Sequence, residues 1–183
     1  MKEKIKAAAL AVFDEKGFYK AGIRDVAALA SCSLPTLYYY YKNKEALFEA
    51  SVCDSYEFLV GQIEEQLPEG LHIQERLYFE VLQRQLLPDE DKRVVRIAIK
   101  MFLGVDGFPE ARERLVAWEN KRKAVTREKL MSASRHKPAF ADMALRVVDN
   151  MLQTSILFGE QLSSDQIRAE LRCLFDAITV YVF

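Results

Sequence analysis

Glycine, proline, cysteine and histidine are all scarce in this chain, which has seven, five, three and two of them among 183 residues. So few glycines and prolines exclude a collagen-like repeat and are not typical of a loop-rich sandwich. The three cysteines, Cys32, Cys53 and Cys173, are odd in number and far apart. Their spacing predicts neither a disulfide framework nor a zinc knuckle, and it is typical of a protein from a reducing cytoplasm.

Sequence patterns that mark catalysis or cofactor binding are missing as well. The two histidines, His72 and His136, have no second metal-ligand residue at a spacing such as His-x-x-x-His. The chain contains no Gly-x-Ser-x-Gly, no Walker loop and no Gly-x-Gly-x-x-Gly. We therefore expect a protein that is not an enzyme and that holds no metal and no cofactor.

Long hydrophobic runs are also absent. None approaches the length of about 20 residues that a membrane-spanning helix needs, and Asp14 and Glu15 interrupt the short apolar stretch that follows Lys6. This opening does not have the pattern of a signal peptide. We expect no membrane partner and a cytoplasmic location.

Neither positive nor negative charge predominates over the chain as a whole, whose formal net charge is −1. This balance excludes a protein that binds any nucleic acid through a global positive field. The first 50 residues carry a net charge of +2 and the remainder carries −3. The asymmetry permits an anionic partner at the N-terminal end without requiring one.

The apolar residues that make up half of the chain recur at intervals of three and four, which is the period of a helix. The pattern predicts an all-α protein with about nine helices. They are expected at Lys2–Lys16, Ile23–Ala30, Leu34–Tyr41, 43–67, Leu71–Leu87, Asp89–Leu103, Pro109–Arg135, Pro138–Gln161 and Ser163–Phe183.

Several predicted helix ends have a local signal. Gly17 can close the first helix in a left-handed conformation, and Asn43 and Asp89 are suitable N-caps. Ser163 and Gln166 match the capping box, in which each side chain bonds the backbone N–H of the other residue. The short helices before residue 43 and the long ones after it predict a small domain at residues 1–47 and a larger helical domain at 48–183.

The first three predicted helices have the lengths of a helix-turn-helix DNA reader. Four consecutive tyrosines, Tyr38–Tyr41, end the third helix, and consecutive helical residues point about 100° apart. If Leu37 and Tyr41 face inward, Pro35 and Tyr39 face outward, and Thr36, Tyr38 and Tyr40 lie on the flanks. Such a surface predicts contact with a partner; the alternative is that the tyrosines cover the join between the two domains.

At these residues the chain resembles the tetracycline-repressor (TetR) family. The resemblance runs from about Ile5 to Phe48, roughly a quarter of the chain, and the remainder resembles the family only in the number and length of its helices. It rests on an Ala-rich first helix and on three motifs: Phe13-x-x-x-Gly17-Phe18, Ile23-Arg24-Asp25-Val26-Ala27, and Ala30-x-x-Ser33-x-Pro35-Thr36-Leu37-Tyr38-Tyr39-Tyr40-Tyr41-Lys42-Asn43-Lys44-Glu45-x-Leu47-Phe48.

The resemblance implies a homodimer that inserts each third helix into the major groove of a palindromic operator and represses until a small molecule binds. By position, four residues would face bases and four others would hold phosphates or the groove edge, while Ser33 would begin the third helix. Two residues depart from the family pattern: Ser31 stands where glycine commonly makes the turn, and Gly22 stands where a hydroxyl residue usually caps the second helix. The base-facing set is Leu34, Pro35, Tyr38 and Tyr39; the other set is Arg24, Thr36, Tyr40 and Lys44.

The last two predicted helices are apolar on more than one side, which predicts a dimer interface made of two helices from each subunit. The alternative is that both pack within one chain around the helix at Asp89–Leu103. The residues expected at the interface are Phe140, Val147, Met151, Phe158, Leu174, Phe175, Ile178, Tyr181 and Val182.

A ligand pocket is predicted between the long helices, although each of its residues also suits an ordinary core. No pair of buried charges is evident, which favours an apolar or aromatic ligand, and the run Lys121–Lys123 is expected on a solvated helix face. The residues expected to line the pocket are Tyr78, Phe79, Leu82, Phe102, Trp118 and Met131.

Two other functions compete with the regulator. An all-α enzyme or acyl-chain carrier would need a cluster of titratable residues, and none is evident. A helical interaction module would use the tyrosine surface to bind protein.

Overall fold

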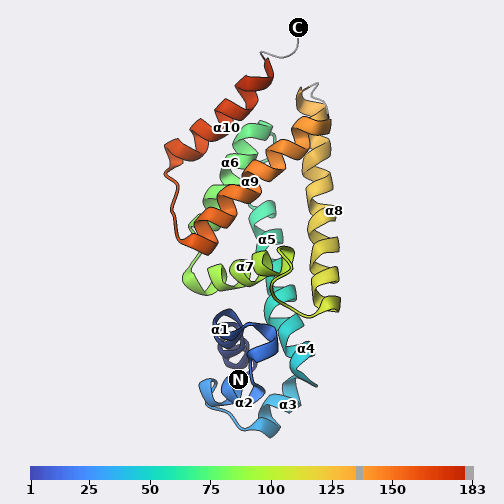
Figure 1. The fold of residues 1–183 in the computed structure, drawn as a ribbon, viewed down its shortest axis with the longest axis vertical. Helices are drawn as coiled ribbons and strands as arrows, with labels where there is room; N and C mark the ends of the chain where they lie inside the picture. The colour runs from blue at the N-terminus through green and yellow to red at the C-terminus, as the bar shows by residue number, and fades with distance from the viewer. Residues whose placement is uncertain (135–137, 180–183) are drawn as a thin grey trace. The chain divides into compact units, whose positions relative to one another are not determined.

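A computed structural model of the chain describes residues 1–134 and 138–179. These residues form helices and no strand (Figure 1). Because α4, η1 and α5 follow one another without a break, the described part of the chain has nine separate helices. The all-α prediction and the predicted number of helices are confirmed.

The helices differ from the predicted ranges mainly at their ends. Their bounds are α1 (Lys2–Lys20), α2 (Ile23–Leu29), α3 (Leu34–Tyr40), α4 (Lys44–Phe48), the π-helix η1 (Glu49–Cys53), α5 (Asp54–Glu65), α6 (Ile73–Gln85), α7 (Asp89–Phe102), α8 (Pro109–Ser134), α9 (Pro138–Phe158) and α10 (Ser164–Thr179).

Two of the predicted caps are confirmed. The Asn43 side chain accepts a hydrogen bond from the backbone N–H of Ala46 at 2.8 Å. At the start of α10, the N–H of Ser163 donates to Gln166 Oε1 at 2.8 Å and the N–H of Gln166 donates to Ser163 Oγ at 3.2 Å. Both side chains satisfy backbone donors that the first helical turn would otherwise leave unpaired.

The predicted cap at Asp89 is wrong. Pro88 occupies the N-cap position of α7 with extended backbone angles, and Asp89 is the first helical residue. Its carboxylate, with those of Glu90 and Asp91, lies in the first turn, where it still interacts favourably with the helix dipole.

The single long helix predicted from residue 43 contains one turn of π-helix, η1, that the sequence pattern does not reveal. Within it, Ser51 is buried, and its hydroxyl donates to the carbonyl oxygen of Leu47 at 2.6 Å. A serine hydroxyl that bonds a carbonyl one turn earlier competes with the backbone ladder, which suits a local widening of the helix.

By packing, the chain divides into two compact units, with the division falling inside α5 and α8. Unit 1 consists of residues 1–61 and 88–118, and unit 2 consists of residues 62–87 and 119–183. Unit 1 therefore includes α7 and the start of α8 in addition to the N-terminal helices. The functional boundary expected after residue 47 stays a prediction.

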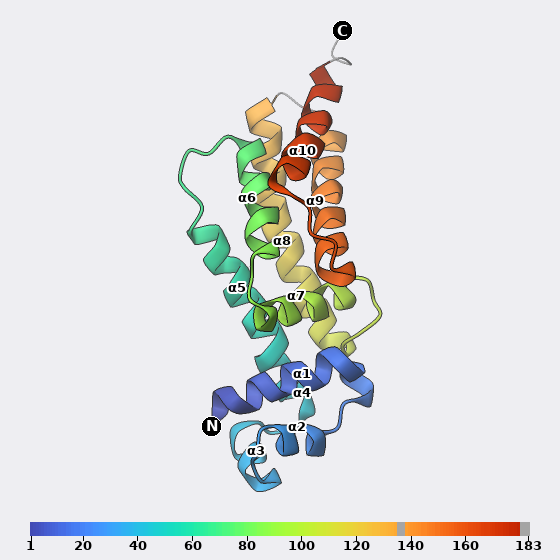
Figure 2. The same ribbon diagram turned by 90° about the vertical axis from the view of Figure 1, so that its left-hand side faces the viewer.

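Unit 1 has an aromatic core. Ring centroids lie 4.9 Å apart for Phe13 and Phe48 and 4.8 Å apart for Phe18 and Phe108. In this unit α1 packs against α2, α4, η1 and α7, and Figure 2 shows α1 lying above the α2–α3 pair. This packing holds α2 and α3 against a rigid base.

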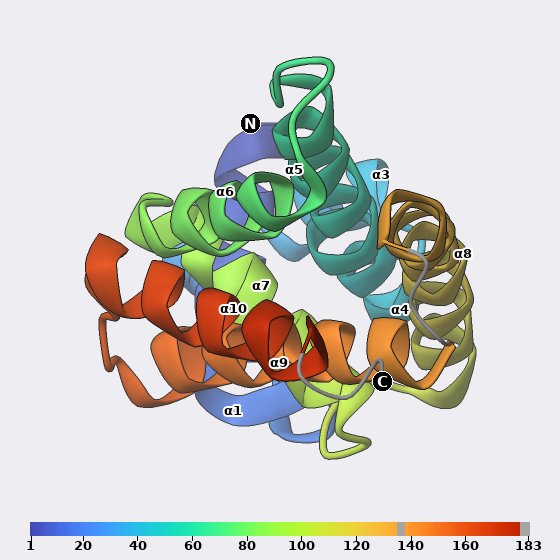
Figure 3. The same cartoon turned by 90° about the horizontal axis from the view of Figure 1, so that it is seen from above.

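Unit 2 has an aliphatic core made by α6, α8, α9 and α10. Leu77, Leu130, Ala144 and Leu171 are completely buried in it. In Figure 3, α6, α9 and α10 lie side by side, and each pair of these helices is in contact. Across the described ranges, no helix is both long and apolar enough to cross a bilayer.

Candidate nucleic-acid interface

The turn between α2 and α3 has the hydrogen bonds of a Schellman motif. The N–H of Cys32 donates to the carbonyl oxygen of Ala27 at 3.0 Å, and the N–H of Ser31 donates to that of Ala28 at 3.1 Å. These two bonds satisfy the last carbonyls of α2 and reverse the chain within a few residues. A short helix, a tight turn and a second short helix therefore follow one another as predicted.

Ser31 occupies the one position of this motif that normally requires glycine. Its φ is +52°, and it is the one residue other than glycine with a positive φ in the described chain. The resemblance places glycine at this position, and the turn keeps its hydrogen bonds with a left-handed serine there. The side chain costs about 1–2 kcal/mol in this conformation.

Ser33 begins α3, as predicted. Its Oγ accepts a hydrogen bond from the N–H of Thr36 at 3.2 Å and lies 2.8 Å from Thr36 Oγ1. Pro35 lies in the first turn, where its missing N–H leaves no helical bond unmade. The N-terminus of α3 is therefore fixed by its own side chains.

The aromatic residues of α3 divide between the core and the surface as the helical period predicts. Leu37 is completely buried and Tyr41 is 4% exposed, whereas Tyr38, Tyr39 and Tyr40 are 51%, 82% and 37% exposed. The rings of Tyr39 and Tyr40 meet edge to face with centroids 5.1 Å apart. This exposure disagrees with the alternative in which the tyrosines cover a join between domains.

Tyr41 is a core residue with an unsatisfied polar group. Its hydroxyl is buried and has no hydrogen-bond partner. Burial, together with the charges of Glu3 and Asp54, raises the pKa of Tyr41 to about 12. Its role is to pack the base of α3, so it contributes no group to the exposed surface.

Lys44, at the start of α4, is held against unit 1. Its ammonium lies 4.5 Å from the centroid of the Phe18 ring and donates to the carbonyl oxygen of Tyr19 at 3.3 Å. Burial lowers its pKa. Its assignment to a phosphate stays a prediction, and such a contact would require the side chain to turn outward.

The remaining predicted contact residues differ in their exposure. Arg24 and Pro35 are exposed, and Leu34 and Thr36 are half-buried. Gly22 caps α2 with extended backbone angles and no side-chain hydrogen bond, so no hydroxyl is available at this position. The predicted base-facing residues are on α3, whereas Arg24 is on α2 and Lys44 begins α4. Their contact with DNA stays a prediction.

The predicted ligand pocket is divided between the two units. In unit 1, Phe102 and Trp118 each meet Tyr56 edge to face, with centroids 5.7 and 5.8 Å away. In unit 2, Tyr78 is buried in the core, and Phe79, Leu82 and Met131 pack against it. Each set has the contacts of an ordinary core, and the ligand role of all six residues stays a prediction.

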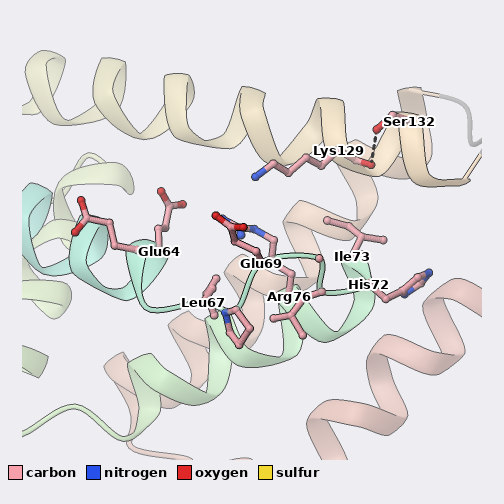
Figure 4. Close-up of a pocket in the computed structure, with 12 residues that line it drawn as sticks. Glu64, Leu67, Glu69, His72, Ile73, Arg76, Lys129 and Ser132 are labelled. Carbon is pink, nitrogen blue, oxygen red and sulfur yellow. Dashed lines mark hydrogen bonds between the residues drawn. The ribbon is translucent and has the colours of Figure 1, made fainter.

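A hollow of about 620 Å³ opens elsewhere in unit 2, and none of those six residues lines it. Figure 4 shows Lys129 of α8 reaching over it from one side, with Glu64, Glu69 and Arg76 on the other. Its lining carries charges of both signs, which is unlike the apolar pocket predicted from the sequence.

The residues predicted at a dimer interface have several different environments. Phe140, Met151 and Leu174 are buried in the core of unit 2, and Val147 and Phe175 pack against that core. Phe158, in contrast, is 73% exposed. The first three are buried within one protomer, where α9 and α10 pack against α6. The role of these residues in a dimer interface stays a prediction. The side chain of Ile178 and residues Tyr181 and Val182 lie outside the described residues.

Unit 2 contains buried charges that the sequence analysis missed. Glu80 and Arg84 are 4% and 1% exposed and form an ion pair at 3.0 Å. Arg122, expected on a solvated face, contacts Glu80 at 2.6 Å and Glu119 at 2.7 Å. Burial alone would raise the pKa of Glu80, but Arg122 and Arg84 hold it at about 2.

A sequence signal for this cluster existed in part. Glu80 and Arg84 are four residues apart, and Glu119 and Arg122 are three apart, which are the spacings of side-chain pairs on one helix face. The contact that joins the pairs, between Glu80 and Arg122, spans 42 residues and leaves no such signal. The absence of buried charge pairs, which favoured an apolar ligand, is therefore wrong.

Metal ligands are not grouped in the described part of the chain, where no three His, Cys, Asp or Glu side chains are arranged to hold an ion. The three cysteines are unpaired: Cys173 is exposed, Cys32 is half-buried and Cys53 is buried. Burial raises the pKa of Cys53 to about 12, so it is an inert core residue.

Comparison with known proteins agrees with this geometry. Residues 5–51 match the family model described as "Bacterial regulatory proteins, tetR family". Solved structures with the same fold include a TetR-family transcriptional regulator from Rhodococcus sp., with a TM-score of 0.73, 17% identity and 96% of this chain and 97% of that chain covered. Another, from Vibrio parahaemolyticus, has a TM-score of 0.68, 17% identity and 96% of each chain covered.

The transcriptional regulator FadR from Bacillus subtilis, solved in complex with stearoyl-CoA, also has this fold, with a TM-score of 0.66, 15% identity and 100% of each chain covered. At such identities the likeness concerns the fold. The resemblance found in the sequence is confirmed: residues 5–51 match the model of the bacterial tetR-family regulatory proteins, and nearly the whole chain has the fold of solved TetR-family transcriptional regulators.

Proposed function

We propose that this protein is a repressor that binds a palindromic operator as a homodimer and leaves it when a small ligand binds. The observation that carries the proposal is the exposed α3 surface, with Pro35, Tyr38 and Tyr39 facing outward at the end of a helix-turn-helix. A soluble reading helix needs side chains that are free to reach base edges and methyl groups in the major groove. A cytoplasmic location follows from this function.

Direct readout is assigned to the outer face of α3. Leu34, Pro35 and the rings of Tyr38 and Tyr39 offer apolar contact to thymine methyl groups, and the tyrosine hydroxyls offer hydrogen bonds. These residues set which bases are preferred. The Tyr39 ring, which is 82% exposed, has the most surface to lose on binding.

Phosphate contacts are assigned to residues around that face. Arg24 supplies a charge, Thr36 and Tyr40 supply hydroxyls, and Lys44 supplies an ammonium once it leaves the Tyr19 carbonyl. Such contacts fix the position of the protein on the duplex without reading sequence. The two charged residues, Arg24 and Lys44, give binding its dependence on salt.

Dimerisation is assigned to exposed apolar residues of α9 together with the C-terminal helix. Phe158 and Met143 are 73% and 43% exposed on α9. A twofold pair of such helices would place two α3 helices on successive half-sites. The core residues Phe140 and Met151 would support this surface from inside.

A ligand-responsive role is supported by the solved relative that holds stearoyl-CoA. In this protein a ligand that binds the form with mismatched reading helices shifts the population away from the operator-binding form. It must prefer that form by about 5.5 kcal/mol to move the population from 1:99 to 99:1.

The deciding experiment selects a duplex from random sequences with the full-length protein and then compares variants on it. We expect a palindromic site, and we expect Tyr39→Ala to weaken binding about 10- to 100-fold, the range of one good base contact. Thr36→Ala and Lys44→Ala should weaken binding of all duplexes. Lys44→Ala, which removes a positive charge, should also lower the slope of log K against log salt by about one.

Lys121→Ala is the matched control, because Lys121 is an exposed lysine of unit 2 far along the chain from α3. It should change neither the affinity nor the slope. Unchanged duplex binding in Tyr39→Ala, Thr36→Ala and Lys44→Ala would instead favour a helical interaction module, or a ligand carrier, that uses the tyrosine surface to bind protein.

A further inference from the structure

Unsatisfied buried polar atoms in this protein gather on one helix. Among the described residues, five buried side-chain nitrogen or oxygen atoms lack a hydrogen-bond partner, and four of them belong to α6. Three of these four lie on consecutive residues at its C-terminal end: Gln83 Oε1, Arg84 Nη2 and Gln85 Nε2. Buried donors and acceptors normally find partners, so this turn of α6 has polar atoms that a bound polar group can satisfy.

Arg84 is the strongest donor of the set. The residue is 1% exposed, and its Nη1 donates to the carbonyl oxygen of Glu80 at 3.2 Å and to Glu80 Oε1 at 3.0 Å. Glu80 Oε1 is shared, because Arg122 Nη1 lies 2.6 Å from the same oxygen. Arg84 therefore shares the carboxylate oxygen that balances its charge with Arg122, and its Nη2 has no acceptor.

Arg122, in contrast, is fully compensated. Its Nε and Nη2 form two hydrogen bonds to the carboxylate of Glu119, at 3.0 and 2.7 Å, and its Nη1 also reaches Glu64 at 3.1 Å. The two buried guanidinium groups of unit 2 thus differ: one is surrounded by carboxylates, and the other keeps an edge open.

Gln85 supplies a second donor whose orientation is fixed. The residue is 4% exposed, and its Oε1 accepts the N–H of Leu162 at 2.9 Å. Exchanging the amide oxygen and nitrogen would lose that bond, so Nε2 is the atom left without a partner. On the same helix, Leu77 and Val81 are buried in the aliphatic core of unit 2.

We propose that the C-terminal turn of α6 receives the carboxylate of an amphipathic organic acid, with Arg84 Nη2 as the main donor and Gln85 Nε2 as a second donor. A carboxylate is the acceptor that a guanidinium edge bonds most strongly, and the apolar residues around this turn suit the body of such an acid. This names the ligand class of the proposed repressor and therefore rests on its ligand-responsive half. It replaces the purely apolar ligand that the sequence favoured.

The test titrates the full-length protein with straight-chain carboxylates from hexanoate to dodecanoate, and with the alcohols and amines of the same lengths, by calorimetry and by thermal shift. We expect at least one carboxylate to bind ten or more times more tightly than its matched alcohol and amine. Equal affinities across the three head groups, or no binding by any carboxylate, would overturn the proposal, because water would then suffice as the partner of these donors.

Variants place the effect on α6. Arg84→Met should remove the preference for the carboxylate, and Gln85→Glu should do the same because it keeps the acceptor for Leu162 while putting a negative charge beside Arg84. Arg127→Met is the control, since Arg127 of α8 forms an exposed pair with Asp142 of α9, and it should keep the preference. A preference that survives in both folded α6 variants contradicts the assignment, and Gln85→Glu serves this purpose should Arg84→Met not fold.

Duplex binding separates this inference from the proposed function. A carboxylate that binds selectively and weakens operator binding supports both. Selective binding in a protein that binds no duplex leaves the α6 site standing and contradicts the repressor. Duplex binding with no head-group preference leaves the repressor standing and contradicts the α6 site.

Discussion

Polar side chains are exposed on the outer face of α3, whereas on α6 and α8 several charged side chains are buried. On α3, the residues that pack inward are Leu37 and Tyr41, and polar or aromatic groups are exposed. On α6 and α8, Glu80 and Arg122 turn inward and are compensated by each other. The first arrangement follows the helical period, and the second depends on partners from distant parts of the chain.

This difference predicts that substitutions on the outer face of α3 affect stability little and that substitutions of the buried charges affect it strongly. Exposed side chains on α3 can be replaced with little effect on folding, because water solvates them in either state. A buried charge that loses its partner remains desolvated, and the protein is destabilised by that uncompensated charge. The predictions below test this contrast, beginning with the largest expected effect.

Removing Arg122 should destabilise the protein more than any other single change considered. Arg122→Met leaves the buried carboxylates of Glu80 and Glu119 without their main partner, and breaking a buried pair costs about 3–5 kcal/mol. Urea unfolding followed by circular dichroism measures the change. The matched control is Arg127→Met on the same helix as Arg122. It removes the more exposed pair of Arg127 with Asp142 of α9, and we expect no measurable change. Equal stabilities of the two variants would contradict the contrast between core and surface.

Acid should remove the same stabilisation in the unmodified protein. Because the pKa of Glu80 is lowered from 4.5 to about 2 in the folded state, its contribution is fully present above pH 4.5 and is lost as the pH falls towards 2. In Glu80→Gln this contribution is missing at neutral pH, so the stability difference between the two proteins should shrink as the pH falls over that interval. Unfolding curves at several pH values measure it, and a constant difference would show that Glu80 is not held ionised by its arginine partners.

Substitution of Gly17 tests whether the positive φ in α1 requires glycine. Its φ is +71° and its ψ is 166°, and an added Cβ would lie 3.2 Å from Asp106 Oδ1, the oxygen that accepts the N–H of Phe18. This region of backbone angles is open essentially to glycine alone, so Gly17→Ala should cost about 1–3 kcal/mol. The control is Gly61→Ala inside α5, where a Cβ meets nothing within 4 Å and the helix should gain about 0.5–1 kcal/mol. Denaturant unfolding of both variants checks the opposite signs.

The sequence predicts the local structure of the N-terminal helices well because its signals are local. Ser33, Asn43 and the tyrosines of α3 act within one or two helical turns, so the period of the chain and the preferences of cap residues are sufficient. Ser31 is identified differently, by the resemblance to a family in which glycine commonly makes this turn, and its φ of +52° agrees with that need.

Contacts between distant residues escape this reasoning. The Glu80–Arg122 contact spans 42 residues, and that between Asp106 and the N–H of Phe18 spans 88. Where charged residues are buried, as on α6 and α8, the apolar pattern of the sequence does not predict which face of the helix is buried. The π-helix at Glu49–Cys53 is missed for a different reason, because Ser51 is an ordinary residue for a helix until its hydroxyl takes the Leu47 carbonyl.

Replacing Ser31 by glycine tests whether the positive φ of this turn destabilises the protein. Ser31→Gly keeps both hydrogen bonds of the turn and removes the steric cost of a side chain at φ +52°. We expect the protein to become more stable by about 1 kcal/mol or less, since the greater flexibility of glycine in the unfolded chain offsets part of the gain. Thermal unfolding measures the gain. Ser31→Ala should give none, and a loss of stability in Ser31→Gly would show that the serine side chain itself supports the turn.

Removing the Tyr41 hydroxyl gives the smallest expected effect. Tyr39 is the matched comparison, because it is a tyrosine two residues away that is exposed, whereas Tyr41 is buried. The buried hydroxyl of Tyr41 lacks a partner, so Tyr41→Phe removes a desolvated polar group while keeping the ring, and the protein should be unchanged or more stable by up to about 1 kcal/mol. Tyr39→Phe should leave stability unchanged, because water solvates that hydroxyl whether or not the protein is folded. Paired thermal unfolding measures both. If Tyr41→Phe were the destabilised variant, its hydroxyl would have a bound water as partner, and the division of this helix into a dry inner face and a wet outer face would be wrong.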